Sequence, residues 1–347
     1  MDPFRVVRLQ HPIDPAFDER LRREPGVSVA AQPLPRDADE ARAALGTADV
    51  YHVHSARDEV PECAQVTEAL LLACPRLLAV STFGAGYDSV DVGACSKAGV
   101  LVMNQRGANK ESVAEHAIGL MLAVLHRIGE SDRALRGPRP DPFTRESLMG
   151  REAHGRVLGI VGIGEIGTRV AQMARAAFGM EVLAVDPYVD AGEVARRGAA
   201  KVELDELLAR SDVVSLHCPR DAATMNLMDG RRFSQMKRGA AFVTTARGGI
   251  HDEVALARAL ASGHLSGAGL DVWQPEPPAA NHPLLAMPNV VATYHTAGVT
   301  HEARRNIAVM GSEQIVQLLR GERPPRLVNP EAWEPFRARF EKRRGGK

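Results

Sequence analysis

A chain of 347 residues is longer than one ordinary hydrophobic core supports, so its length predicts two domains. Hydrophobic residues make up 45% and charged residues 25% of the chain, a composition that is typical of globular proteins and unlike that of disordered or fibrous ones. The 43 basic residues balance the 43 acidic ones, which argues against binding to nucleic acid or to a membrane surface.

The N-terminal segment MDPFRVVRLQHPID is charged and interrupted by prolines, so we do not expect a signal peptide. No apolar run approaches the ~18 residues of a membrane-spanning helix. Cys63, Cys74, Cys95 and Cys218 form neither a CxxC motif nor a metal-ligand spacing, which favours reduced thiols in a cytoplasmic protein and no bound metal. The basic end EKRRGGK is expected to be a solvated, disordered tail.

Short apolar, β-branched runs alternate with longer helical patterns along the chain. The predicted strands cover residues 49–54, 76–81, 156–162, 181–186, 212–217, 240–245, 267–272 and 289–294. Strands that are apolar throughout and alternate with helices predict parallel sheets covered on both faces, which is the α/β class with doubly wound domains.

Two of the predicted helices between these strands show distinctive patterns. Residues 111–128 (ESVAEHAIGLMLAVLHRI) are apolar nearly all round, so this helix should be deeply buried, either inside one subunit or between two. A loop rich in proline and glycine, residues 135–143, separates it from the next strand. The second helix, residues 252–263, ends in the glycine expected past a helix terminus.

The segment RVLGIVGIGEIGTRVAQMARAAFGMEVLAVDP carries a strand, a glycine turn, a helix and a second strand. In the turn Gly162-x-Gly164-x-x-Gly167, the first glycine permits the tight turn and the second lets a pyrophosphate approach the backbone. The third lets the helix pack against the strand, and the pyrophosphate then rests on the helix N-terminus. Asp186 ends the second strand 19 residues later, where a carboxylate accepts hydrogen bonds from a ribose and repels a 2′-phosphate. This pattern predicts NAD binding and favours NAD over NADP.

Polar residues follow three further predicted strands, where a doubly wound sheet opens its ligand crevice. Arg247 follows strand 240–245, Asp271 and Glu276 follow strand 267–272, and His295 follows strand 289–294. Singly, each could be a loop or structural residue. Together they suit a carbonyl–alcohol redox reaction, because arginine binds a carboxylate, histidine exchanges a proton and a carboxylate orients the imidazole.

Seven segments in order support a resemblance to a known family: STFGAGYDSVDV, NQRGANKESVAEHAIGLML, GIVGIGEIG, HCPRDAATMNLMD, TTARGG, GAGLDVWQPEP and HTAGVT. Over roughly residues 45 to 330 the chain resembles the D-2-hydroxyacid dehydrogenase family, which includes glycerate, phosphoglycerate and D-lactate dehydrogenases. In that family the arginine of ARGG, the glutamate of the EP dipeptide and the histidine of HxAG are catalytic. They match Arg247, Glu276 and His295.

The resemblance implies two Rossmann-like doubly wound domains. A cofactor domain, residues 105–296, is expected to be inserted into a flavodoxin-like substrate domain, which is made of residues 1–104 and 297–347. In the family, the helix that matches 111–128 also forms much of a two-fold dimer interface. The resemblance therefore implies a homodimer.

The implied reaction is hydride transfer between NAD(H) and a 2-oxo or D-2-hydroxy acid, with His295 as the proton carrier and Glu276 as its partner. The expected substrate contacts are His54, Ser55, Gly84, Ala85, Gly86 and Arg247. The expected cofactor contacts are Gly162, Gly164, Glu165, Ile166, Gly167, Asp186, His217, Pro219, Thr224, Thr245, Ala246, Arg247, Asp271, His295 and Gly298.

The chain departs from the family pattern at several positions without losing a catalytic group. Tyr294 stands where the family usually has proline, Thr244 where asparagine is common and Arg220 where leucine is usual, and the Glu276-to-His295 spacing is one residue longer.

The substrate loop is more informative. Phosphoglycerate dehydrogenases have the sequence Arg-Ser in this loop, and the arginine helps to bind the phosphate group of their substrate. Here His54-Ser55 takes that place, with Arg57 two residues later. An unphosphorylated 2-oxo acid such as glyoxylate or hydroxypyruvate is therefore expected. His52, His54 and Arg57 would contact a polar substrate group, or else form a solvated loop.

Two alternatives stay open. Phosphite or formate oxidation on the same scaffold is one, although formate dehydrogenases carry glutamine where this chain has Glu276. The other is an NADH-sensing binding protein like the corepressors of this family, which can retain the catalytic set. A partner that binds only in the presence of NADH would favour the second.

Overall fold

The computed structural model describes residues 2–138 and 144–345, which form two compact units. Unit 1 comprises residues 1–109 and 300–347, and unit 2 comprises residues 110–299. The chain thus leaves unit 1, completes unit 2 and returns to unit 1. The predicted domain crossings lie near residues 104 and 297, and the unit boundaries lie a few residues later in each case.

Unit 2 is built on a seven-stranded sheet in which every strand pair is parallel. The strand order is β12-β11-β10-β9-β6-β7-β8. The strands are β6 (Val157–Val161), β7 (Glu181–Val185), β8 (Ala200–Lys201), β9 (Val213–Leu216), β10 (Ala241–Thr244), β11 (Gly267–Leu270) and β12 (Val290–Ala292). The order runs outward in both directions from β6, as in a Rossmann-type doubly wound sheet.

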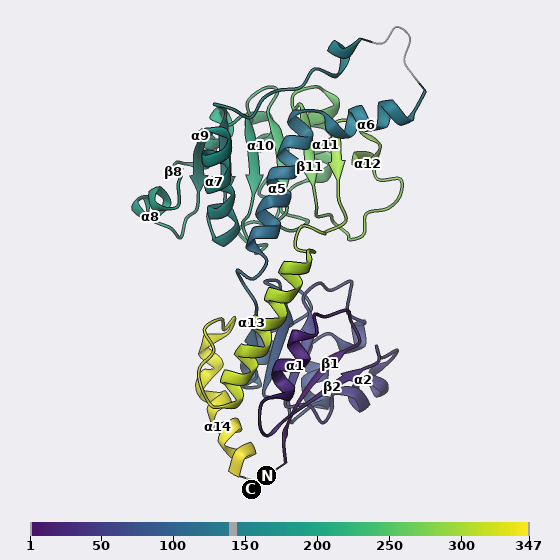
Figure 1. Cartoon of the computed structure of the whole chain (residues 1–347), viewed down its shortest axis with the longest axis vertical. Coiled ribbons are helices and arrows are strands. Elements are labelled where there is room, and N and C mark those ends of the chain that lie inside the picture. Colours follow the sequence, from purple (N-terminus) through teal and green to yellow (C-terminus); the bar gives the residue numbers. More distant parts are fainter. Residues whose placement is uncertain (1, 139–143, 346–347) are drawn as a thin grey trace. The chain divides into compact units, whose positions relative to one another are not determined.

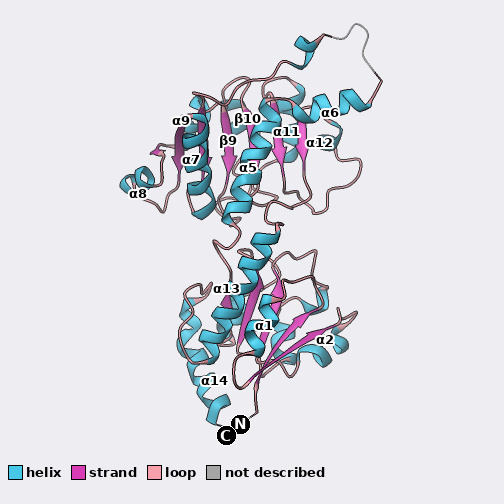
Figure 2. Cartoon of the chain, viewed as in Figure 1, coloured by secondary structure: helices cyan, strands magenta, loops and turns pink. Residues whose placement is uncertain are grey.

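Helices cover both faces of this sheet (Figures 1 and 2). They are α5 (Lys110–Leu125), α6 (Ile128–Arg136), α7 (Glu165–Phe178), α8 (Ala191–Arg196), α9 (Leu204–Arg210), α10 (Gly230–Gln235), α11 (Glu253–Ala261) and α12 (Pro283–Ala286), with a 3₁₀ turn at Arg145–Leu148. Helices α5 and α7 pack beside each other on one face, and α9, α10 and α11 cover the other. Successive strand residues alternate between the two cores: Val213 and Val243 face α5 and α7, whereas Val214 and Phe242 face the opposite layer.

Helix α5 lies close to strand β11, because that strand presents glycines to it. A Cβ on Gly267 would lie 2.8 Å from Cγ1 of Val124, and a Cβ on Gly269 would lie 2.8 Å from Cβ of Leu120. The helix predicted for residues 111–128 corresponds to α5 but ends three residues earlier than predicted, and Arg127 adopts the left-handed conformation between α5 and α6. Only part of α5 is buried within the chain, and Gly119 is exposed.

Unit 1 contains a five-stranded parallel sheet in the order β2-β1-β3-β4-β5, which is the flavodoxin-like order. Its strands are β1 (Phe4–Leu9), β2 (Val27–Gln32), β3 (Val50–His54), β4 (Ala79–Phe83) and β5 (Leu101–Met103). Its helices are α1 (Ala16–Arg22), α2 (Ala38–Leu45), α3 (Glu68–Ala73), α4 (Val92–Lys97), α13 (His301–Leu319) and α14 (Trp333–Gly345), with 3₁₀ turns at Glu62–Ala64 and Pro330–Ala332. Helices α1, α13 and α14 share a core on one face of this sheet, and α2, α3 and α4 share one on the other.

The expectation of a disordered basic tail is wrong for the described residues. Helix α14 continues to Gly345, because Phe336 and Phe340 lie one turn apart and are buried against unit 1. Arg343 then donates from Nε to Oδ1 of the fully buried Asp49 at 2.8 Å. The side chain also reaches the carbonyl oxygens of Asp2 and Pro3, so both chain ends are joined in one unit.

The predicted loop at residues 135–143 lies partly outside the described residues, and α6 extends to Arg136 at its start. In the part of the chain that the structure describes, no helix is both long and apolar enough to cross a membrane. The four cysteines are free.

Candidate active site

The carboxyl ends of the strands of unit 2 meet at one edge of the sheet, because all of them are parallel. The predicted residues follow these strands in turn: the glycine turn after β6, Asp186 after β7, His217 after β9, Arg247 after β10, Glu276 after β11 and His295 after β12. The strand order reverses beside β6, and doubly wound sheets bind ligands outside such a switch point.

The glycine turn after β6 leaves open space at its second glycine. Gly162 has a φ of +91°, and a Cβ there would lie 2.6 Å from the backbone nitrogen of Cys218. A Cβ on Gly167 would lie 2.2 Å from the carbonyl oxygen of Gly162, so α7 packs directly on the turn. A Cβ on Gly164 would meet nothing within 4 Å, and no side chain caps the N-terminus of α7. Uncapped helix amides beside open space fit the pyrophosphate of NAD. Glu165 and Ile166 form the first turn of this helix.

Asp186 lies across from the glycine turn and is fixed by two backbone amides. Its Oδ2 accepts a hydrogen bond from the amide of Ile163 at 3.1 Å, and its Oδ1 accepts one from the amide of Tyr188 at 3.0 Å. The carboxylate is thus held at the end of β7, beside the turn, in the place where a ribose diol of NAD would be bound.

His295 and Glu276 form a carboxylate–imidazole pair. Nδ1 of His295 lies 2.9 Å from Oε2 of Glu276, and Oε1 of Glu276 accepts from the backbone amide of Trp273 at 2.9 Å. Both side chains are partly buried, with 33% and 20% of their surfaces exposed. Because Nδ1 is engaged with the carboxylate, Nε2 is the nitrogen that can exchange a proton with a substrate.

The backbone that carries His295 is a turn held by one buried carboxylate. His295 has a φ of +51°, which is unusual for a residue other than glycine. Oδ1 of Asp271 accepts from the hydroxyl of Thr293 at 2.6 Å and from the amide of Thr296 at 2.9 Å, and its Oδ2 accepts from the amide of Ala297 at 3.0 Å. Asp271 is completely buried. In the structure, Asp271 therefore fixes the turn that carries His295. Its predicted contact with the cofactor stays a prediction.

The charges of this site shift the pKa of each partner in the direction that keeps the pair ionised. Burial alone lowers the pKa of His295, but the hydrogen bond and the charge of Glu276 outweigh it, and the net pKa is raised. Burial alone raises the pKa of Glu276, but His295 and the amide of Trp273 outweigh it, and the net pKa is lowered. The positive charge of Arg247 acts on both groups and lowers both values.

Arg247 lies in a loop that packs tightly on the segment before Glu276. A Cβ on Gly248 would lie 1.8 Å from the carbonyl oxygen of Trp273, so only glycine permits this approach. The guanidinium of Arg247 donates from Nη1 to the carbonyl oxygen of Ala246 at 2.8 Å. Thr245 is buried just before it, at the end of β10. The loop therefore brings the predicted arginine to the same sheet edge as Glu276 and His295.

The other predicted cofactor residues of unit 2 lie at the same edge. Burial lowers the pKa of His217 to about 4, so this imidazole is neutral near pH 7, and its Nε2 lies 2.9 Å from the hydroxyl of Ser215. Pro219 is exposed, and its carbonyl oxygen accepts from the hydroxyl of Thr224 at 2.7 Å. Gly298 follows the His295 turn and is half-buried.

The predicted substrate residues of unit 1 follow β3 and β4 of its own sheet. Gly84 has a φ of +130°, the hydroxyl of Ser55 donates to the carbonyl oxygen of Phe83 at 3.1 Å, and Asn104 donates from Nδ2 to the carbonyl oxygen of Ala85 at 2.8 Å. His54 ends β3, and Gly86 is half-buried in the loop after β4.

The suggestion that His52 contacts a polar substrate group is wrong. Its ring stacks on Phe17 with centroids 4.3 Å apart, and its Nδ1 lies 3.1 Å from the hydroxyl of Ser81. The residue is 4% exposed, and burial lowers its pKa to about 3, so it is a neutral core residue. Arg57, in contrast, is exposed.

The structure adds residues to the site that the sequence did not single out. His116 of α5 places Nε2 3.0 Å from the hydroxyl of Thr293, which itself donates to Asp271. Trp273 donates from its indole Nε1 to the carbonyl oxygen of Thr293 at 3.1 Å. These contacts join segments far apart in the chain, so no local spacing signals them. Among the described residues, no group of three or more His, Cys, Asp or Glu side chains could hold a metal ion.

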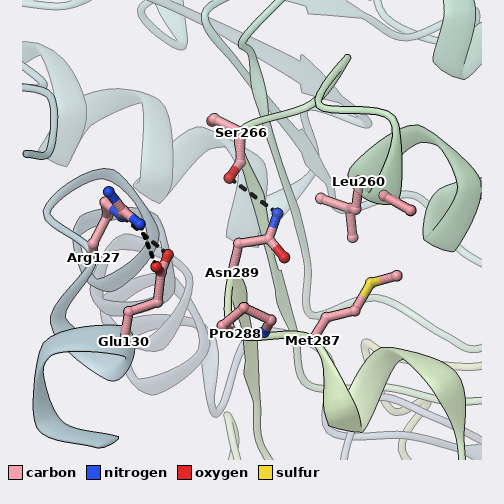
Figure 3. A pocket seen from close by; sticks show the side chains of 8 residues that line it. Arg127, Glu130, Leu260, Ser266, Met287, Pro288 and Asn289 are labelled. Atoms are coloured by element: carbon pink, nitrogen blue, oxygen red, sulfur yellow. Dashed lines mark hydrogen bonds and ion pairs between the residues drawn. The ribbon is translucent and has the colours of Figure 1, made fainter. Parts of the chain in front are cut away.

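A cavity of about 400 Å³ lies at the opposite edge of the same sheet (Figure 3). Ser266 and Asn289 line it just before β11 and β12 begin, and Nδ2 of Asn289 donates to the carbonyl oxygen of Ser266 at 3.3 Å. On another side, Nε of Arg127 donates to Oε1 of Glu130 at 3.1 Å. None of the predicted site residues lines this cavity, so we do not assign it to the reaction.

Residues 118–297 match the family model described as the NAD-binding domain of D-isomer-specific 2-hydroxyacid dehydrogenases. Among similar proteins, a D-3-phosphoglycerate dehydrogenase from Archaeoglobus fulgidus is 38% identical over 271 residues, covering 78% of this chain and 51% of that protein. A glyoxylate reductase from Korarchaeum cryptofilum is 39% identical over 260 residues, covering 75% of this chain and 78% of that protein. The chain therefore spans about half the length of the phosphoglycerate dehydrogenases it matches and more of the glyoxylate reductase.

Solved structures show the same fold. The crystal structure of a glyoxylate reductase from Paecilomyes thermophila superposes with a TM-score of 0.82 at 28% identity, covering 95% of this chain and 99% of that one. The agreement extends over both units of the chain.

Proposed function

The chain belongs to the family of D-isomer-specific 2-hydroxyacid dehydrogenases, and on that premise we propose that it is an NAD-dependent oxidoreductase that interconverts a small 2-oxo acid and a D-2-hydroxy acid. The observation that carries this proposal is the His295–Glu276 pair, joined at 2.9 Å at the same sheet edge as Arg247 and the glycine turn. That edge combines a proton carrier with a site suited to a dinucleotide.

In the proposed reaction, NADH supplies the hydride when it is bound. Arg247 holds the substrate carboxylate and polarises the carbonyl group, because its guanidinium is always charged and presents several donors. His295 donates a proton from Nε2 to the carbonyl oxygen, and Glu276 stabilises the imidazolium before that transfer. Asp186 holds the cofactor ribose, and the amides at the start of α7 hold its pyrophosphate. In the reverse direction, neutral His295 accepts the proton of a hydroxy acid.

We propose an unphosphorylated substrate such as glyoxylate or hydroxypyruvate, with His54, Ser55 and residues 84–86 as contacts in unit 1. The loop reads His54-Ser55, without the arginine that helps phosphoglycerate dehydrogenases bind phosphate. The similarity to glyoxylate reductases supports the same choice, whereas the similarity to phosphoglycerate dehydrogenases marks phosphohydroxypyruvate as the competing substrate.

The test is NADH oxidation by the purified protein with glyoxylate, hydroxypyruvate, pyruvate, phenylpyruvate, 2-oxoglutarate, oxaloacetate and phosphohydroxypyruvate. We expect the highest kcat/KM with an unphosphorylated acid. With that acid, the His295→Ala variant should have a kcat about 10²- to 10⁴-fold lower than the wild type, while it still binds NADH. Preference for phosphohydroxypyruvate would refute the substrate assignment. If NADH binds but none of the acids is reduced, phosphite oxidation becomes the next hypothesis to test, followed by NADH-dependent binding of a partner protein.

We also propose that two copies of the chain associate through residues 111–128, since the resemblance implies a dimer there and Gly119 of α5 is exposed in the single chain. Sedimentation should give twice the chain mass, and a monomer at micromolar concentration would contradict the proposed dimer.

Four free cysteines suit a reducing compartment, so we place the enzyme in the cytoplasm.

A further inference from the structure

We infer that Glu253 and His282 form a second carboxylate–imidazole pair, which positions the loop that carries Glu276. The inference rests on the proposed function, because Glu276 is proposed there as the partner of the proton carrier. Neither Glu253 nor His282 is among the residues predicted for catalysis or binding, and we assign them a positioning role.

The contacts of Glu253 are directed at the Glu276 loop. Glu253 lies in the first turn of α11, and its Oε1 accepts from the backbone amide of Gln274 at 2.9 Å. Its Oε2 lies 3.0 Å from Nε2 of His282, just before α12. The side chains are only 10% and 19% exposed, so this pair is buried more deeply than that of Glu276 and His295.

Two consecutive amides of the loop are divided between the two carboxylates. The amide of Trp273 donates to Glu276, and the amide of Gln274 donates to Glu253. The indole of Trp273 packs edge-on against the ring of His282, with centroids 5.6 Å apart, and donates to the carbonyl oxygen of Thr293, two residues before His295. The loop is therefore held from α11 on one side and from the His295 turn on the other. A shift of Gln274 would move Glu276 relative to the imidazole.

Burial, hydrogen bonds and neighbouring charges act together on the pKa of Glu253. Burial raises its pKa, the amide of Gln274 and the imidazole of His282 oppose that rise, and the charge of Glu276 adds to it, so the net pKa is raised. His251 and Asp252 precede it on the chain, and His251 is buried and neutral near pH 7, because burial lowers its pKa to about 4. The two donors therefore offset the effect of burial on Glu253 only in part.

The experiment compares Glu253→Ala, Glu253→Gln and Asp252→Ala in the full chain. Glu253→Ala removes the acceptor of the Gln274 amide, and a small displacement of a reacting group can cost about a hundredfold in rate. We expect kcat to fall roughly ten- to a hundredfold with NADH affinity unchanged. Glu253→Gln keeps an oxygen for that amide and should stay within about threefold of the wild type. Asp252→Ala removes the N-cap of the same helix, where Asp252 accepts from the amides of Val254 and Ala255, and should keep its kcat.

A second measurement does not need turnover. Titration of the His295 imidazole by NMR, without substrate, should give a lower pKa in Glu253→Ala than in the wild type, since Glu276 raises that pKa only while it is in place. An unchanged His295 titration in Glu253→Ala overturns the inference, as does an equal loss of kcat in Asp252→Ala or in Glu253→Gln. Failure of every 2-oxo acid with the wild type would instead refute the proposed function, and the titration would still test the positioning.

Discussion

The opposite pKa shifts of His295 and Glu276 define a range of pH in which both partners are charged. The folded pKa of His295 is raised, so its contribution to stability is complete below the unfolded value and is lost as pH rises through the folded one. The folded pKa of Glu276 is lowered, so its contribution is present above its unfolded value and is lost as pH falls through the folded one. In the proposed reaction, reduction of an oxo acid needs the protonated imidazole, so we expect the same range of pH to govern the rate.

Glu276→Gln should shift the alkaline limit of oxo-acid reduction to lower pH. The amide keeps a hydrogen-bonding group near Nδ1 but removes the charge that raises the pKa of His295. We expect kcat to fall by about 10²-fold near pH 8 and by less near pH 6. The pH–rate profile of kcat measures this. Parallel losses at both values of pH would mean that Glu276 acts by geometry alone.

Asp186→Asn should weaken the preference for NADH over NADPH. The change keeps an oxygen for one backbone amide but removes the charge that repels a 2′-phosphate, so the ratio of kcat/KM values should fall by roughly tenfold. Asp190→Asn is the control, because Asp190 is the exposed N-cap of α8 and asparagine caps equally well. An unaltered ratio in Asp186→Asn would remove Asp186 from cofactor recognition.

At the scale of the elements, the contact between α5 and β11 depends on glycines in the strand. Gly269→Ala would place a Cβ 2.8 Å from Cβ of Leu120, so the helix must move, and we expect a loss of ~1–3 kcal/mol in the free energy of unfolding. Gly230→Ala is the matched control, because its Cβ would meet Ala255 at an ordinary 3.7 Å. Urea denaturation measures both. Equal stability of the two variants would show that the α5 contact is more tolerant than the geometry indicates.

Apolar runs in the sequence predicted the central strands of unit 2 closely, since a strand buried on both faces carries a continuous signal. Strand β4 begins three residues later than predicted, because Arg76 and the residues after it form the approach to the strand. Strands β1, β2, β5 and β8 were not predicted, since β2 is only half-buried and β5 and β8 have only three and two residues. The prediction of a disordered C-terminal tail was wrong because it considered only the charges of residues 341–347. The preceding residues Phe336 and Phe340 are buried and anchor the helix.

The sequence predicted which residues stand at the strand ends, because the order of strands and motifs is local information. Apart from the pairing of Glu276 with His295, it did not predict the contacts that hold these residues in place. The contacts of Asp271 to the 293–297 turn and of Glu253 to Gln274 join segments about 20 residues apart, and His116 comes from a helix much earlier in the chain. His52 shows the converse error, because it lies inside the predicted strand 49–54, whose expected burial on both faces already argued against a substrate contact.

At the scale of the whole molecule, each unit has its own hydrophobic cores, so the units should unfold separately. Calorimetry of the full chain should show two transitions. NADH at a hundred times its Kd should stabilise the transition of unit 2 by about 2.7 kcal/mol, because the glycine turn and Asp186 belong to that unit. A single transition, or an equal response of both, would show that the units unfold together.

Since residues 300–347 belong to unit 1, the order in which the chain is synthesised does not match the order in which its units can be completed. Unit 2 is contiguous and can fold as soon as residue 299 has left the ribosome. The first 109 residues must wait until α13 and α14 have been made, and at about 5–20 residues per second this delay lasts roughly 10 to 50 seconds. During that interval the apolar face that later receives α13 is uncovered on a nascent chain, which makes it the surface that a chaperone would meet first.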